Sequence, residues 1–206
     1  MIVSLNPGAP QEREKELISR ERLGPGCCAG SDAAHRAHAE AVLGNCTVSY
    51  RDPPPGRDYI FHRRSVALAR AALRALARDD DDWFELTWFT DLYKCSTPDE
   101  SSPKIRGGAI AACRPWLDDE LLLFEPTVVL ALGTVVQKEL CGGADGIPAD
   151  PRIVPFPHPS PANSGTWQKL PVHIDQFGLI RRAAGMPPMS APERAELRSF
   201  LESLDE

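Results

Sequence analysis

The chain has 206 residues, of which 42% are hydrophobic, so it can bury one core of ordinary domain size. It contains no apolar run of about 18 residues and no signal-peptide pattern at its N-terminus, which predicts a cytoplasmic protein without membrane contact. A net charge of −6 excludes a generally basic surface, so contacts with nucleic acid would depend on local groups of arginine and lysine.

The N-terminal quarter begins with a predicted buried strand over residues 2–5, which stops at the Asn-Pro-Gly sequence of residues 6–8. A charged helix is expected over residues 10–23, with its proline in the first turn. Glycines and prolines interrupt residues 24–57, where the stretch around 32–43 has a modest helical pattern. We interpret this interrupted segment as a lid or an insertion.

Helices and strands alternate through the rest of the chain, as the hydrophobic spacing indicates. The expected elements are a helix over 61–77, a strand over 84–90, a helix over 109–124, a strand over 127–132 that turns into a helix over 134–140, a strand over 152–156 and a C-terminal helix at about 190–204. Strands that alternate with helices predict a parallel sheet covered on both faces. We therefore expect an α/β fold, three-layer α/β/α with a central four-stranded parallel sheet, in a single domain over residues 1–206.

Asn6 and His158 each follow a short apolar run that is expected to form a strand. Because the carboxyl ends of parallel strands meet at one edge of a sheet, the two side chains are predicted to converge there. Taken singly, Asn6 is equally typical of a turn or a helix N-cap, and His158 of a loop histidine that anchors a proline-rich turn. The two residues by themselves therefore leave the function open.

Four short motifs follow one another along the chain. They are Ser4-Leu5-Asn6-Pro7-Gly8, Phe89-Thr90-Asp91-Leu92-Tyr93-Lys94-Cys95, Pro126-Thr127-Val128-Val129-Leu130-Ala131-Leu132-Gly133 and His158-Pro159-Ser160-Pro161. In this order they resemble the motifs of the uracil-DNA glycosylase superfamily, closest to its iron-sulfur-type and mismatch-specific branches, over about residues 1–165. The resemblance implies a monomeric, monofunctional DNA glycosylase that hydrolyses the N-glycosidic bond of a damaged or deaminated base, uracil or a related one, in base-excision repair.

The resemblance also assigns roles to the residues of the first and last motifs. Asn6 would position the attacking water, and Pro7 and Gly8 would lie against the base. His158 would donate a hydrogen bond to the uracil O2, where negative charge accumulates as the glycosidic bond breaks. A neutral imidazole is sufficient for that role.

Contacts to DNA and to the face of the base are assigned in the same way. Ser160 and Asn163 would bind a backbone phosphate, whereas Ala162 is a poor wedge for the space left by a flipped base. Phe61 is expected to stack on the base, with Tyr59 as the second choice and a place in the core as the alternative for Phe61. The arginines of the predicted 61–77 helix form either a basic patch or an ordinary solvated face.

Asp91 departs from the resemblance, since relatives of the iron-sulfur branch carry Asn at this point. An ionised carboxylate accepts hydrogen bonds and donates none, so it would accept from the uracil N3 but repel O4. A base edge with an amino group beside a ring donor would suit it better. Asp91 therefore predicts an altered base preference, for a deaminated purine or a modified pyrimidine. The alternatives are a protonated Asp91, or a capping or salt-bridged aspartate near Lys94.

The cysteines raise the question of a cofactor. Cys95 and Cys113 match the second pair of ligands in the branch that carries a [4Fe-4S] cluster, which needs four thiolates. In that branch the first pair precedes the first motif, which here opens the chain. A truncated start, replacement ligands among Cys27, Cys28 and Cys46, and loss of the cluster are the alternatives. A zinc site of Cys27 or Cys28 with His35 and His38 competes with unliganded side chains.

Two other classes of function compete with a glycosylase that acts on DNA. A non-catalytic descendant of the superfamily would bind nucleic acid or a nucleobase through the same cleft, and the acidic charge and Asp91 favour it. Asn6 and His158 favour the enzyme. An unrelated α/β small-molecule enzyme is disfavoured, because the sequence has no glycine-rich phosphate loop and no nucleophile elbow.

Overall fold

The computed structural model describes residues 1–4, 60–92, 107–141, 150–160, 164–168, 170–171 and 174–204. The predicted helix over 10–23 and the predicted lid or insertion over 24–57 lie outside the described residues. Several residues singled out in the sequence also lie outside them, namely Asn6, Pro7, Gly8, Cys27, Cys28, His35, His38, Cys46, Tyr59, Lys94, Cys95, Ala162 and Asn163.

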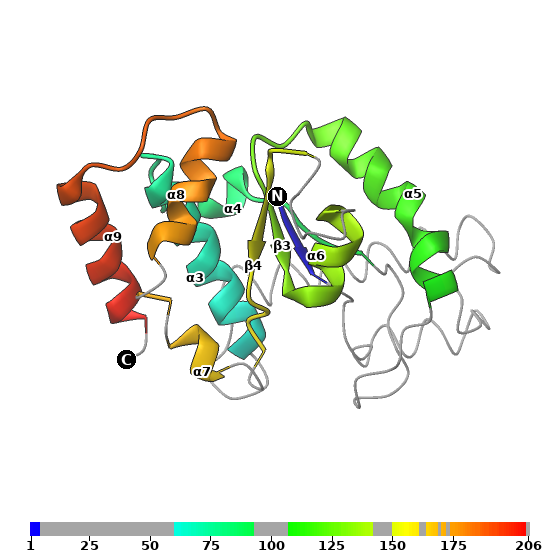
Figure 1. Ribbon diagram of the computed structural model, residues 1–206, viewed down its shortest axis with the longest axis horizontal. Helices are drawn as coiled ribbons and strands as arrows, with labels where there is room; N and C mark the ends of the chain where they lie inside the picture. Colours follow the sequence, from blue (N-terminus) through cyan, green and yellow to red (C-terminus); the bar gives the residue numbers. More distant parts are fainter. Residues whose placement is uncertain are drawn as a thin grey trace.

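A parallel sheet of four strands forms the centre of the fold (Figure 1). The strand order is β2-β1-β3-β4, with β1 at Ile2–Ser4, β2 at Phe89–Asp91, β3 at Val129–Leu132 and β4 at Ile153–Phe156. Every neighbouring pair is parallel, so the chain returns to the same edge after each strand. The register pairs Ser4 with Asp91 and Leu132 with Phe156, which sets these strand ends at the carboxyl edge of the sheet.

Helices cover both faces of the sheet, which confirms the predicted three-layer α/β/α architecture (Figure 1). One layer contains α3 (Ile60–Ala75), α8 (Ile174–Ala183) and α9 (Ala191–Ser203), drawn on the left of the sheet. The other layer contains α5 (Gly107–Phe124) and α6 (Gly133–Cys141), drawn on the right. The short helix α7 (Ser164–Trp167) follows β4. Among the described helices, none combines the length and the hydropathy that a membrane crossing requires.

Alternate strand residues face the two helical layers, because successive side chains of a strand point to opposite sides. The α3 side of the core contains Ile2, Leu130, Leu132, Val154 and Phe156, and the α5 side contains Val3, Val129, Ala131 and Ile153. Both faces are therefore apolar. This explains why the strands appear in the sequence as continuous apolar runs and not as alternating patterns.

The strand predicted over residues 84–90 is wrong in its first half. The chain forms a helical turn, α4, at Trp83–Leu86, and β2 begins only at Phe89. The carbonyl of Asp82 accepts two backbone hydrogen bonds, at 3.1 and 3.0 Å, that close this turn. The Trp83 ring packs against the α3 side of the core, edge-on to Phe89 with centroids 6.2 Å apart. Packing of the half-buried Trp83 thus overrides the β propensity of this segment, whereas Phe84 is exposed.

The C-terminal helix α9 is confirmed, and it begins with a capping box. The Ser190 hydroxyl accepts the backbone N–H of Glu193 at 3.4 Å, and the Glu193 carboxylate accepts the backbone N–H of Ser190 at 2.7 Å. The buried Arg181 of α8 also donates to Glu193, at 2.6 Å. The hydrogen bonds from Ser190, followed by that from Arg181, lower the pKa of Glu193 to about 2.

Candidate active site

The carboxyl edge of the sheet brings together three residues that the sequence singled out. Asp91 ends β2, His158 follows β4 by two residues, and Phe61 lies in the first turn of α3. The rings of Phe61 and His158 have centroids 5.3 Å apart and are tilted by 30°. Phe61 also lines the same pocket as Asp91. A ring, a carboxylate and an imidazole from three separate elements therefore share one site.

The pocket at this edge, called here the carboxyl-edge pocket, has a volume of about 30 Å³. It is lined by Ile2, Ser4, Phe61, Ser65, Phe89, Thr90, Asp91 and Leu132. The apolar residues of this set form its walls, and the other four lining residues, Ser4, Ser65, Thr90 and Asp91, are polar. A volume of this size accommodates roughly two water molecules. The described walls thus form a small pocket that is rich in polar groups.

His158 is held as a neutral imidazole with a defined tautomer. Burial lowers the pKa of His158 below its ordinary value of 6.5, so the ring is uncharged near pH 7. The backbone N–H of Ser160 donates to His158 Nδ1 at 3.2 Å. Nδ1 is therefore an acceptor, and the ring proton resides on Nε2. The imidazole is set up to donate a hydrogen bond from Nε2.

Gly133 provides the space that His158 occupies. A Cβ at Gly133 would lie 3.1 Å from the Cβ of His158, and Gly133 has a φ of +82°, where side chains other than glycine are strained. Gln137 of α6 donates to the carbonyl of Phe156 at 2.7 Å and so fixes the end of β4 just before His158. The turn from β3 into α6 therefore shapes one side of the site.

Ser4 is a partner of Asp91 that the sequence interpretation missed. The buried Ser4 lies opposite Asp91 in the register of β1 and β2, and its hydroxyl donates to Asp91 Oδ1. A hydrogen bond from the neighbouring strand therefore orients the carboxylate. The signal that could have revealed Ser4 is its position as a small polar residue at the end of an apolar strand, but the register was needed to pair it with Asp91.

Arg64 connects α3 to the loop that carries His158. Its Nη1 donates to the carbonyl of Ser160 at 3.0 Å and, more weakly, to that of Pro159 at 3.4 Å. The guanidinium also lies over the ring of Trp167, 5.3 Å from its centroid. Arg64, which the sequence placed only in a basic patch or a solvated face, thus positions the loop between β4 and α7.

Two other arginines of α3 are engaged in ion pairs. Arg70 pairs with Asp80 at 2.8 Å and Asp81 at 3.2 Å, and Arg74 pairs with Asp80 at 2.9 Å. Both positive charges are therefore compensated by the acidic segment that follows the helix. These two side chains attach that segment to α3 and do not form a basic patch.

Cys113 is buried on α5 and carries a free thiol, as does Cys141 of α6. Within the described residues, no group of three or more His, Cys, Asp or Glu side chains is placed to hold a metal ion. A [4Fe-4S] cluster needs four thiolates, and Cys95, the expected companion of Cys113, lies outside the described residues. The cluster therefore stays a prediction.

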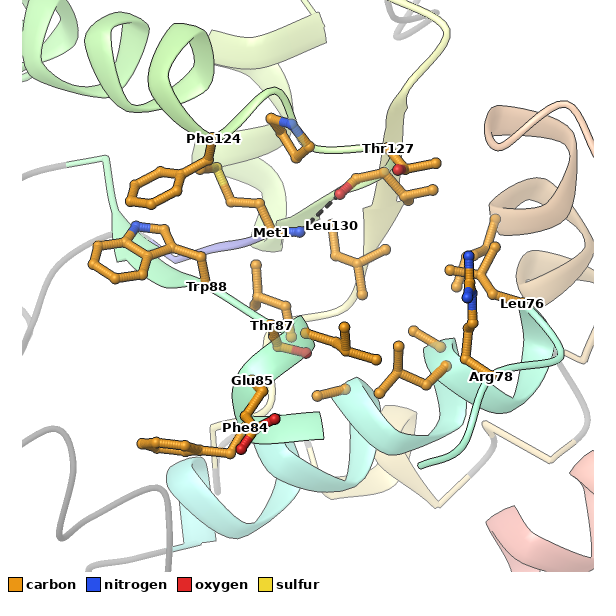
Figure 2. A pocket seen from close by; sticks show the side chains of 18 of the residues that line it. Met1, Leu76, Arg78, Phe84, Glu85, Thr87, Trp88, Phe124, Thr127 and Leu130 are labelled. Atoms are coloured by element: carbon orange, nitrogen blue, oxygen red, sulfur yellow. Dashed lines mark hydrogen bonds between the residues drawn. The ribbon is translucent and has the colours of Figure 1, made fainter. Parts of the chain in front are cut away.

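A larger cavity lies at the opposite, amino edge of the sheet (Figure 2). This amino-edge cavity has a volume of about 680 Å³ and is lined mostly by apolar residues of β1, α3, α4 and β3 with their connections. Trp88 and Phe124 stack at one end of it, with ring centroids 4.4 Å apart, and Leu76 and Arg78 lie at the other (Figure 2). The Met1 nitrogen donates to the carbonyl of Val128 at 2.8 Å across its wall. Among the described residues, none that was assigned a role from the motifs lines this cavity.

Comparison with known proteins places the described site within one family. A family model described as the Uracil DNA glycosylase superfamily matches residues 57–177, which is more than half of the 206 residues. The matched range contains Phe61, Asp91, His158 and Ser160, whereas Asn6 precedes it. No curated protein and no solved structure gives a significant match.

Proposed function

The chain belongs to the uracil DNA glycosylase superfamily, and on that premise we propose that it hydrolyses the N-glycosidic bond of a damaged or deaminated base in DNA. The observation that supports this proposal most directly is the neutral His158, whose Nδ1 accepts the Ser160 N–H beside the ring of Phe61. Bond cleavage leaves the base as an anion. A preorganised donor at the site where that charge develops stabilises the transition state.

In the proposed reaction the base leaves the DNA stack and enters the site at the carboxyl edge. His158 donates from Nε2 to the base oxygen that becomes negative, and the hydrogen bond from Ser160 to Nδ1 keeps the ring proton on Nε2. The ring of Phe61 offers a stacking face for the base. Asn6 is proposed to hold the attacking water by its amide carbonyl, although it lies outside the described residues.

The same loop is proposed to contact the DNA backbone. The main-chain N–H of Ser160 is used by His158, so the Ser160 hydroxyl is the group we propose for a phosphate oxygen. Asn163 is proposed to act beside it, although its placement is outside the described residues. Arg64 holds the carbonyls of Pro159 and Ser160 and would keep this loop in place when DNA binds.

The proposal is tested first by alkaline strand scission on oligonucleotides that carry uracil, hypoxanthine, xanthine or a modified cytosine, each in single- and double-stranded form. We expect the purified protein to release at least one of these bases. Asn6→Ala, purified in parallel, should lose the activity and thereby exclude a contaminating glycosylase. If the folded protein releases none of the bases, the enzyme assignment is rejected in favour of a non-catalytic descendant that binds nucleic acid or a nucleobase.

Base preference is tested by Asp91→Asn. The amide can both donate and accept, so we expect the ratio of kcat/KM values to shift toward uracil relative to the other bases. The carboxylate of Asp91 is oriented by Ser4, and an amide oxygen can accept the same hydrogen bond, which makes the exchange conservative for the fold. An unchanged ratio would reject the interpretation that Asp91 disfavours uracil.

A further inference from the structure

Ser65 is a buried polar residue without an evident structural purpose. It lies on α3, one turn after Phe61, and its side chain is 0% exposed. Its hydroxyl has no hydrogen-bond partner among the residues that the structure describes. A helical serine ordinarily bonds the carbonyl four residues earlier, and buried hydroxyls that forgo every partner are rare in folded proteins. The hydroxyl of Ser65 could therefore form a hydrogen bond with a bound ligand.

The location of Ser65 suggests what that partner is. Ser65 lines the carboxyl-edge pocket together with Asp91 and Phe61, the residues proposed to read and stack on the base. Of the other hydroxyl groups that line the pocket, Ser4 donates to Asp91 and Thr90 donates to Glu120. Of these three hydroxyl groups, that of Ser65 is thus the one without a partner in the described part of the chain.

We propose that Ser65 and Asp91 together read the lactam edge of the extruded base, meaning a ring N–H next to a carbonyl. This inference rests on the proposed glycosylase function. The Asp91 carboxylate accepts from the ring N–H, and the Ser65 hydroxyl donates to the neighbouring carbonyl oxygen. Two side chains then supply the acceptor and the donor that a single amide would combine.

This pairing accounts for the carboxylate at position 91 without excluding uracil. A carboxylate facing a lactam leaves the carbonyl oxygen repelled and unpaired, and a hydroxyl donor in the same pocket removes that penalty. Uracil and hypoxanthine both have a lactam edge. Cytosine and adenine have a ring acceptor beside an amino group instead, so the Asp91 carboxylate would face a ring acceptor. The pair would therefore discriminate deaminated bases from their parents.

The test compares Ser65→Ala, Ser65→Cys and Asp91→Asn, alone and as Ser65→Ala/Asp91→Asn, on oligonucleotides with uracil or hypoxanthine. Ser65→Ala should lower kcat/KM by about 10-fold or more. The melting temperature should be unchanged or raised, because the hydroxyl makes no hydrogen bond within the described structure. Ser65→Cys keeps the side-chain volume but is a weak donor, so it should lose activity as Ser65→Ala does. In the Asp91→Asn background the loss should shrink to about threefold, since the amide supplies its own donor.

The possible outcomes separate this inference from the proposed function. Excision by the unmodified protein with undiminished activity of Ser65→Ala would overturn the role of Ser65 and leave the glycosylase standing. The same holds if Ser65→Cys is fully active, because shape and not hydrogen bonding would then matter. Release of only a base with an amino group at this edge would likewise overturn the role of Ser65 and leave the glycosylase standing. Failure to release any base would instead overturn the proposed function, and the inference with it.

Discussion

The two edges of the sheet differ in volume and in polarity, and volume alone would point to the wrong edge. The amino-edge cavity measures about 680 Å³ and is mostly apolar, whereas the carboxyl-edge pocket measures about 30 Å³ and contains Ser4, Ser65 and Asp91. Phe61 and His158 stand next to the small pocket and far along the strands from the large cavity. Cavity volume shows where the fold leaves space, whereas converging polar side chains indicate where a reaction can be catalysed.

The difference has a physical origin in the parallel sheet. Each strand delivers its last side chains, and the loop after it, to the carboxyl edge, so polar groups distant in sequence meet there without disturbing the core. At the amino edge the chain enters the strands, and its side chains mainly complete the packing of α3 and β1. The two edges should accordingly respond to mutation in opposite ways, with activity lost at one and stability lost at the other.

The largest contrast is expected between His158→Ala and Trp88→Ala. Removal of the proposed donor should slow excision about 100-fold or more with little change in stability. Trp88, which stacks on Phe124 at the amino-edge cavity, should behave conversely. Its loss should lower the free energy of unfolding by about 1–3 kcal/mol and leave excision by the folded fraction unchanged. Single-turnover rates and urea unfolding measure the two quantities, and equal loss of activity in both variants would remove the distinction between the edges.

Gly133→Ala offers a second contrast, with Gly185→Ala as its matched control. Both glycines have positive φ values, +82° and +68°, so an alanine should cost roughly 1–2 kcal/mol of stability at either position. A Cβ at Gly133 additionally meets His158, whereas one at Gly185 meets nothing within 4 Å. Gly133→Ala should therefore also reduce excision by about 10-fold or more, because a displaced donor is poorly aligned. Full activity of Gly133→Ala would show that the exact position of His158 is unimportant.

Arg64→Met tests whether the loop after β4 depends on the hydrogen bonds that Arg64 donates to it. Arg70→Met is the control on the same helix. Arg64 holds the carbonyls of Pro159 and Ser160, and its loss should reduce excision by about 3- to 10-fold. Arg70 pairs with Asp80 at 2.8 Å, away from the site, so its replacement should lower the melting temperature slightly at constant activity. Equal activity of the two variants would mean that the loop is held by other contacts.

The two edges also differ in how far the sequence could predict them. The apolar run of β3 and the helical spacing of α3 are local signals, and each was predicted correctly because neighbouring residues determine it. The segment before β2 was predicted wrongly, because its aromatic residues suit either a strand or a packed turn. Only the core decides between the two.

The candidate site was predictable in its motif residues and not in their partners. Asp91 and His158 stand in recognisable motifs, Phe61 was expected from the resemblance, and the fold brings the three together. The contacts of Ser4 and Arg64 depend on strand register and on how α3 meets the loop after β4, neither of which is encoded in local spacing. Ser65 could have been noticed as a polar residue on the apolar face of α3, one turn after Phe61.

The smallest expected effect is a dependence of stability on pH that originates partly at the carboxyl edge. Burial lowers the pKa values of His158 and His62, whose ring lies edge-on to Phe61. As the pH falls through about 6.5, the unfolded chain takes up protons that the native histidines do not yet bind. Stability should therefore decrease from pH 7.5 to 5.5, by at most about 1.4 kcal/mol per pH unit for each histidine.

Urea unfolding of the unmodified protein and of His158→Ala at both pH values isolates the share of His158. The carboxyls with lowered pKa values, Asp150 and Glu193, stay ionised in both states of the protein across this range. The Met1 amine, whose pKa burial lowers to about 6, titrates equally in both proteins and cancels in the difference. The decrease should be smaller for His158→Ala. An identical decrease in both proteins would mean that the native His158 takes up its proton as readily as the unfolded chain, and that burial does not keep it neutral.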